Sequence, residues 1–169
     1  AEAEARAAYE KDLVYRRGAS LQGGVYVRPS AMTPPNPYLA HLPDRDVVTT
    51  TGQALTLVNP AYMTRQVHDL GAAQYGARGH ITSLNPLNPA NRPDAWEAGV
   101  LRSFERGTAQ ASTLMEIDGR TYFRLMRPFV TEASCLRCHA AQGYRVGDIR
   151  GGVSVSLPFD RYRASARAG

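Results

Sequence analysis

With 169 residues and 43% hydrophobic content, the chain can bury one ordinary core, which excludes a disordered segment and predicts a single domain over residues 1–169. No apolar run approaches the ~18 residues of a transmembrane helix, so the chain itself is not expected to cross a membrane. The formal charge of +5 comes from nineteen arginines and one lysine. These basic residues are scattered singly, which argues against nucleic-acid binding.

The first third of the chain predicts one long helix, a strand and a loop. Residues 1–22 are rich in Ala, Glu, Arg and Leu and lack Pro, which favours a helix that ends at Gly23-Gly24. Alternation over residues 24–28 is typical of a short strand. Residues 29–58 contain five prolines and predict a long ordered loop with at most one helical turn. An edge strand is expected within residues 49–58.

A second helix is predicted from Asn59-Pro60, because Asn is a good N-cap and Pro suits the first helical position. Met63, Val67 and Leu70 recur at helical spacing and predict one apolar stripe. Gly71 is expected to end this helix.

The next segment predicts a strand, a turn-rich loop and a third helix. Residues 80–84 favour the strand, and the Asn- and Pro-rich residues 85–91 favour turns. After Pro93, an apolar face over residues 96–104 indicates the third helix, with Gly107 beyond its end.

The last part predicts three strands. Residues 113–117 and 120–130 flank Asp118-Gly119, a strong signal for a hairpin turn. Residues 153–159 alternate between apolar and polar side chains, which predicts a strand with one buried and one polar face. Helices combined with an antiparallel sheet indicate an α+β domain.

Chemistry is concentrated in Cys135-Leu136-Arg137-Cys138-His139, which has the C-x-x-C-H pattern of c-type haem attachment. Two thiols separated by two residues can add to the two vinyl groups on one edge of the macrocycle. The following imidazole then reaches the iron from one face of the ring. The motif therefore predicts one covalently attached haem c, with His139 as an axial ligand.

Two other roles for the cysteine pair are weaker. A redox C-x-x-C normally begins the helix of a βαβ unit, and no such unit precedes Cys135. A zinc site needs four ligands, and no second Cys/His pair stands at a suitable spacing.

Several further sequence blocks outside the haem motif are distinctive, and one of them is T-L-V-N-P-A-Y-M-T-R-Q. They stand in order at residues 23–27, 36–39, 56–66, 83–86, 91–97, 124–128 and 147–152. Together with the motif they resemble the Tll0287-like family of c-type haem sensor domains, over residues from about 10 to 160.

The resemblance implies a PAS-like antiparallel sheet flanked by helices. Residues 1–22 would form an N-terminal signalling helix, and residues 23–160 would form the haem-binding core. It also implies a position on the periplasmic side of the inner membrane, between two membrane helices outside this chain. The charged, Ala-rich start of the chain fits a piece taken from such a protein.

The ligand opposite His139 is not fixed by the motif. Met63 is the first candidate, because it lies in a family block and a methionine from this region is a ligand in some relatives. The alternative is that Met63 only fills space in the core. Since no third cysteine exists, a distal thiolate is excluded. The other candidates are Met32, Met115, Met126, His41, His68 and His80.

Three further residues are candidates for contacts with the haem carboxylates: Arg137, Arg65 and Tyr144. Arginine pairs with carboxylates through two parallel hydrogen bonds, which is the physical reason for the choice. Each could equally be an ordinary surface residue.

Three functions are compatible with such a haem. The resemblance implies the input domain of a histidine kinase or chemoreceptor, which detects redox state or a diatomic gas such as NO, CO or O2. The alternative is an electron-transfer c-type cytochrome that meets an electron donor. An enzyme such as a peroxidase is not expected, because no distal acid–base pair can be argued from the sequence. A homodimer is expected, since signalling modules usually act as symmetric dimers.

Overall fold

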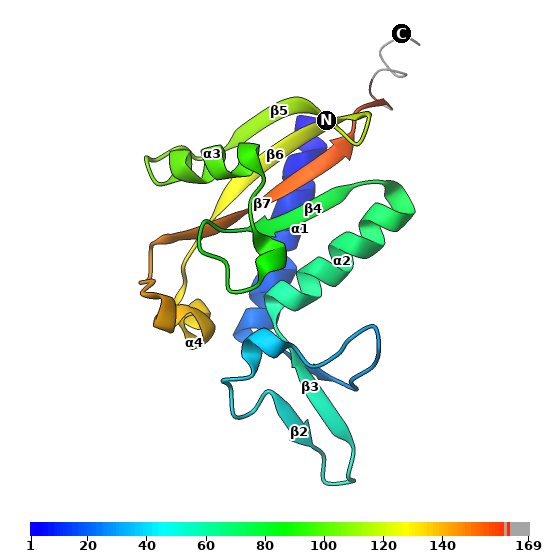
Figure 1. Cartoon of the computed structure of the whole chain (residues 1–169), viewed down its shortest axis with the longest axis vertical. Helices are drawn as coiled ribbons and strands as arrows, with labels where there is room; N and C mark the ends of the chain where they lie inside the picture. The colour runs from blue at the N-terminus through cyan, green and yellow to red at the C-terminus, as the bar shows by residue number, and fades with distance from the viewer. Residues whose placement is uncertain (161, 163–169) are drawn as a thin grey trace.

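The computed structural model describes residues 1–160 and 162, and it has an α+β fold with two antiparallel sheets (Figure 1). The helices are α1 (Glu2–Leu21), α2 (Pro60–Tyr75), α3 (Ala95–Phe104) and α4 (Leu136–His139). The strands are β1 (Val25–Val27), β2 (Asp46–Val48), β3 (Ala54–Val58), β4 (Arg78–Thr82), β5 (Ala111–Ile117), β6 (Arg120–Val130) and β7 (Ile149–Pro158). Single 3-10 turns are η1 (Pro37–Leu39), η2 (Pro89–Asn91), η3 (Ala133–Cys135) and η4 (Ala140–Gln142). The predicted α+β class and the long N-terminal helix are confirmed.

The main sheet has the strand order β4-β7-β6-β5 and is covered on both faces. On one face, Ala5 and Tyr9 of α1 pack against Leu125 and Val153 of the two central strands. On the other face, the apolar side of α3 packs against Met126. Figure 1 shows α1 running behind this sheet, so the first helix belongs to the core of the domain.

The prediction of one polar face for the last strand is wrong, because every residue of β7 from Gly151 to Pro158 is buried. Val153 and Val155 face α1, and the alternate residues Ser154 and Ser156 lie under the opposite layer. The Ser154 hydroxyl donates a hydrogen bond to the Glu97 carboxylate, which removes the cost of burying this polar group.

Helix α2 extends past Gly71, which was expected to end it, and stops at Gly76. Gly76 has φ of +69°, the left-handed conformation that commonly closes a helix. The predicted apolar stripe is also wrong, because Val67 and Leu70 are exposed. The buried residue of α2 is Thr64, whose hydroxyl meets Arg16 of α1.

The small sheet lies at the other end of the molecule and has the order β1-β3-β2 (Figure 1). Strand β3 is therefore central, which corrects the expectation of an edge strand, and β2 was not predicted. The strands β1 and β4, the turn-rich 85–91 loop, helix α3 and the hairpin of β5 and β6 agree with the predictions.

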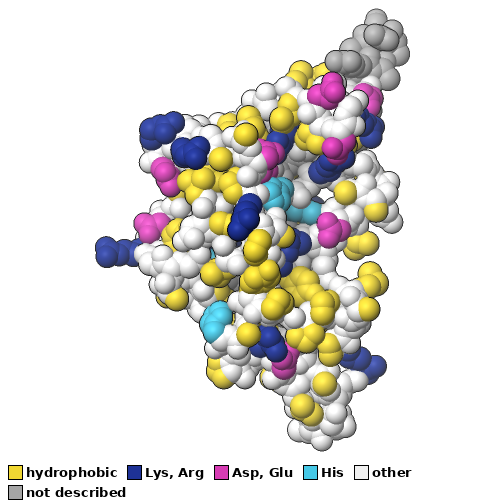
Figure 2. Space-filling model, in the orientation of Figure 1, with side chains coloured by type: hydrophobic (Ala, Val, Ile, Leu, Met, Phe, Trp, Pro, Cys, Tyr) yellow, Lys and Arg dark blue, Asp and Glu magenta, His cyan; other side chains and the backbone are white. Residues whose placement is uncertain are grey.

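The surface carries mixed charge. On the face drawn in Figure 2, Arg side chains and acidic side chains are interspersed. None of the helices in the described part of the chain has the length and apolar character that crossing a membrane requires.

Candidate functional site

The haem motif lies in a loop between β6 and β7 that is closed at its base by backbone hydrogen bonds. The Thr131 amide donates to Asp148 O, and the Gly147 amide donates to Thr131 O, each at 2.9 Å. Within the loop, Cys135 ends η3, and Cys138 and His139 lie on the single turn of α4. The closed base holds the motif as one compact unit against the rest of the domain.

Residues distant in sequence hold this loop in place. The Ser20 hydroxyl of α1 bonds the Ser134 hydroxyl at 2.8 Å. Arg137 donates to the Asp44 carboxylate at 2.6 Å and to Gly23 O at 3.1 Å. The motif is thus tied both to the end of α1 and to the small sheet.

Both cysteines line a cavity of about 440 Å³, which we call the main cavity. This volume is within the range of small-molecule sites. Its other walls come from α1, the small sheet, the start of α2 and the main sheet. The lining residues are Leu13, Val14, Arg16, Arg17, Ser20, Gly23, Leu42, Leu57, Asn59, Pro60, Ala61, Phe129, Val130, Glu132, Ser134, Cys135, Arg137, Cys138, His139 and Arg150.

A smaller pocket of about 70 Å³ adjoins the main cavity at His139 and Arg150, and we call it the polar pocket. Three arginines, five asparagines and two tyrosines line it together with twelve other residues. They come from α1, the η1 turn, the start of α2, the 83–91 loop, the motif loop and the adjoining strands of the main sheet. Figure 1 shows that these segments meet beside α4 at the lower end of the main sheet.

The tautomer of His139 follows from its hydrogen bonds. Gln142 donates its amide to Asn85 O at 2.9 Å, so its carbonyl oxygen faces His139 Nδ1 at 2.5 Å. A carbonyl oxygen only accepts, so Nδ1 carries the proton and Nε2 keeps its lone pair. Burial lowers the pKa of His139, and the charge of Arg150 lowers it further. The lowered pKa favours the neutral imidazole, and the Gln142 acceptor leaves Nε2 unprotonated on the side that faces Arg150, which is the form that ligates metals.

The two thiols are free and half-buried. The Glu132 amide approaches Cys135 Sγ at 3.4 Å, and burial raises the pKa of Cys138. Neither sulfur is engaged in a disulfide, so both are available to form thioether bonds.

Two arginines meet at the boundary of the two cavities. The Arg16 guanidinium lies over the Phe129 ring at 4.4 Å, and the Arg150 guanidinium lies over the same ring at 5.3 Å. Arg150 also brings one terminal nitrogen to 3.4 Å from His139 Nε2. Burial lowers the pKa of Arg16 to about 10, and the charge of Arg150 contributes.

The residues predicted to contact haem carboxylates fall in different places. Arg65 and Tyr144 line the polar pocket, and Arg65 stacks on Tyr62. Arg137 lines the main cavity, but its guanidinium already pairs with Asp44. The carboxylate-binding role of these three residues stays a prediction.

Met63 lies on α2 outside the residues that line either cavity in the described chain. Its role as a ligand stays a prediction without geometrical support. Every other candidate for the sixth ligand is engaged or positioned elsewhere. Met32 and His41 are exposed, Met126 is buried in the core, Met115 contacts Arg124, His68 bonds Asp12, and His80 bonds Glu97.

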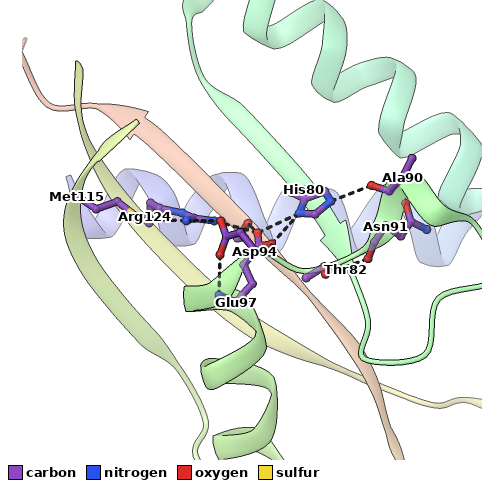
Figure 3. Close-up of polar contacts among 9 residues, drawn as sticks. His80, Thr82, Ala90, Asn91, Asp94, Glu97, Met115 and Arg124 are labelled. Carbon is purple, nitrogen blue, oxygen red and sulfur yellow. Dashed lines mark hydrogen bonds and ion pairs between the residues drawn. The ribbon is translucent and has the colours of Figure 1, made fainter. Parts of the chain in front are cut away.

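A second polar cluster lies away from the haem motif, between α3 and the main sheet (Figure 3). The Glu97 carboxylate accepts from Arg124 at 2.9 Å and from His80 Nδ1 at 2.9 Å. His80 Nε2 faces Ala90 O at 3.1 Å. Burial lowers the pKa of His80, but the hydrogen bond and charge of Glu97 outweigh it, and the pKa is raised. The acceptor at each ring nitrogen and the raised pKa favour the protonated form of His80, and the ring ties the 83–91 loop to α3.

Comparison with known proteins gives one family. A family model described as Tll0287-like matches residues 1–158. The chain belongs to the Tll0287-like family. The crystal structure of the cyanobacterial heme-protein Tll0287 is similar, with 21% identity and a TM-score of 0.48 over 60% of this chain and 73% of that one. No curated protein matches the sequence.

The residues of this Tll0287-like domain fit a c-type haem. Two free thiols at the required spacing and one unprotonated imidazole nitrogen meet at a cavity with mainly apolar walls. Sequence reasoning missed Gln142, Arg16 and Arg150. Two signals in the sequence could have found two of them. Arg150 lies in the 147–152 block, and Gln142 stands three residues after His139. Nothing in the sequence of α1 distinguishes Arg16 from its neighbours.

Proposed function

We propose that this domain binds one haem c through Cys135 and Cys138, with His139 as an axial ligand to the iron. The observation that carries the proposal is the meeting of both free thiols and the unprotonated Nε2 of His139 at one cavity. When bound, the haem supplies a redox-active iron. The role of the chain is to hold this group in a mainly apolar site and to orient His139 through Gln142.

We further propose that the domain is the sensing input module of a histidine kinase or chemoreceptor. Family membership supports this role, and so does the position of α1. Leu13, Val14 and Arg16 of this helix line the main cavity, so a change of redox state or gas ligand at a haem held there would reach the helix without an intermediate element.

The same proposal has consequences for location and assembly. Haem c is attached outside the cytoplasm, so the domain would act on the periplasmic side of the inner membrane. It would have no catalytic activity of its own. Val14 and Leu21 are exposed apolar residues on α1, and they support the proposed homodimer. Light scattering over a concentration series tests this assembly.

Covalent attachment is tested on a denaturing gel stained for haem peroxidase activity. We expect the wild-type chain to keep the stain after acid–acetone extraction. The Cys135→Ser/Cys138→Ser variant should lose it, and Ser134→Ala should keep it as the neighbouring control. A wild-type chain that releases its haem would refute the attachment.

Sensing is tested by hydrogen exchange of the haem-loaded protein in the ferric, ferrous, and ferrous CO- or NO-bound states. Optical spectra of the same samples report redox state and ligand binding. We expect the exchange of α1 amides to change between states, while that of α3, on the opposite face of the sheet, does not. Equal exchange of α1 in all states would favour the electron carrier.

A further inference from the structure

Arg16 and Arg150 at the boundary of the two cavities, and Arg65 in the polar pocket, have no carboxylate within ion-pair distance among the described residues, whereas other arginines pair with Asp or Glu. The charge of Asp12 acts on Arg16 from further away, but its carboxylate bonds His68 and Tyr15. Among the described residues that line the polar pocket, none is an Asp or a Glu. Glu132 lines the main cavity and lies 3.7 Å from Arg17.

Arg16 is the more buried of the central pair, with 7% of its surface exposed. Its guanidinium donates to Thr64 Oγ1 at 3.1 Å and to Pro60 O at 3.4 Å, both neutral acceptors. Burying a guanidinium without a counter-charge is costly. Packing alone gives no reason to keep a charged group here, since an apolar side chain would fill the same space.

Arg150 carries a second sign of a missing partner. Its Nε is buried and has no hydrogen-bond partner, while its terminal nitrogen reaches only the His139 ring at 3.4 Å. Buried donors are almost always satisfied in folded proteins. An unsatisfied guanidinium donor in the wall shared by two cavities indicates that a ligand atom belongs there.

We propose that Arg16 and Arg150 bind a carboxylate or another small oxyanion at the boundary of the main cavity and the polar pocket. A planar anion accepts two parallel hydrogen bonds from a guanidinium, and it supplies the directly bonded opposite charge that both side chains lack. The anion is either a propionate of the bound haem or a free oxyanion from solution. In the first case the inference rests on the proposed haem binding.

The site has a structural consequence. Arg16 belongs to α1, and Arg150 lies at the start of β7, next to the motif loop. A shared anion therefore bridges the first helix to the strand that follows the motif. This bridge replaces repulsion between two like charges with attraction.

The two sources of the anion are distinguished on the haem-loaded protein. The first arm is a calorimetric titration of the ferrous protein with formate, whose carboxylate has little affinity for ferrous iron. The second arm is resonance Raman of the haem propionate bending band. Both arms compare wild type with Arg150→Gln, with Arg16→Gln as a second variant and Arg102→Gln, exposed on α3, as the matched control.

A free oxyanion site gives saturable formate binding that Arg150→Gln weakens about tenfold, equal to about 1.4 kcal/mol. A propionate site gives no formate binding, and the propionate band shifts in Arg150→Gln but not in Arg102→Gln. Either result supports the inference. Absence of formate binding together with an unchanged band in Arg150→Gln overturns it, and this decision holds even where Arg16→Gln fails to fold.

A failure of the proposed haem binding can be distinguished from a failure of the proposed anion binding. A chain without haem staining refutes the proposed function, and formate titration of that same chain still decides whether Arg16 and Arg150 bind an anion.

Discussion

Replacing Glu97 by Leu is expected to destabilise the domain strongly. Glu97 is 1% exposed and accepts hydrogen bonds from Arg124, His80 and Ser154 and from the Asp94 amide that begins α3. The substitution leaves the Arg124 guanidinium, which is 4% exposed, with only the half-exposed Asp94 carboxylate. The main cost is a buried guanidinium that has lost its buried counter-charge and keeps only a partly exposed one.

The size of the effect follows from the bonds that are lost. Each hydrogen bond to a charged group contributes about 1.5–3 kcal/mol, and of the four bonds that Glu97 accepts, the two from Arg124 and His80 join it to basic side chains and dominate the loss. This sum agrees with the ~3–5 kcal/mol measured generally when one partner of a buried pair is removed. Because a domain is stable by only ~5–15 kcal/mol, the variant should be marginally folded.

Urea unfolding measures the change as a shift of the midpoint at unchanged slope. Asp160→Ala is the control, because it breaks an exposed pair with Arg120 and should cost about 1 kcal/mol or less. The double variant Glu97→Leu/Arg124→Met removes both charges and should be more stable than Glu97→Leu alone. A double variant as unstable as the sum of the two single changes would refute the role assigned to the buried charge.

Three further predictions concern single residues. Since the pKa of His80 is raised on folding, its stabilisation is fully present below about pH 6.5 and is lost as pH rises through the raised pKa. Unfolding midpoints should therefore fall with rising pH above this point, and His80→Gln should flatten the slope. Gln142→Leu removes the acceptor of His139 Nδ1 and should raise the reduction potential of the haem in a potentiometric titration; an unchanged potential would contradict its orienting role. Met63→Ala should shift the ferric spectrum toward high spin if Met63 is the predicted ligand; unchanged ferric and ferrous spectra would refute that role and agree with its position outside both cavities.

Elements controlled by local chemistry were predicted well. The predicted Asp118-Gly119 turn sets the register in which Ile117 faces Arg120, and the third helix, predicted from its apolar face, is capped by a reciprocal box of Asp94 and Glu97. Both signals depend on residues within four positions of each other, so the sequence displays them directly.

Elements controlled by distant partners were not predicted. Strand β2 contains three residues and exists because β3 pairs with it. In the sequence, Ser154 has the alternation of a surface residue. In the structure it is buried beneath α3, where its hydroxyl bonds the Glu97 carboxylate. Helix α2 continues through Gly71 because the following turns pack on β4, which offsets the cost of a glycine within a helix.

The residues of the candidate site also fall into a local group and a group brought together by packing. The thiols and His139 form one contiguous motif, so they were found from spacing alone. Arg16 and Arg150 are 134 positions apart in the printed sequence, and only the packing of α1 on the sheet brings both onto Phe129. Pattern reasoning cannot find such a pair, because each member lies in an unremarkable local context.

Helix α1 also constrains the order in which the protein matures. It stands before every strand in the printed sequence, yet it packs on β6 and β7, the last two strands. The wall that α1 contributes to the main cavity therefore forms only when these late strands are in place. In the proposed haem protein, docking of α1 would close one side of the cavity, so a macrocycle would have to enter before α1 packs on the sheet.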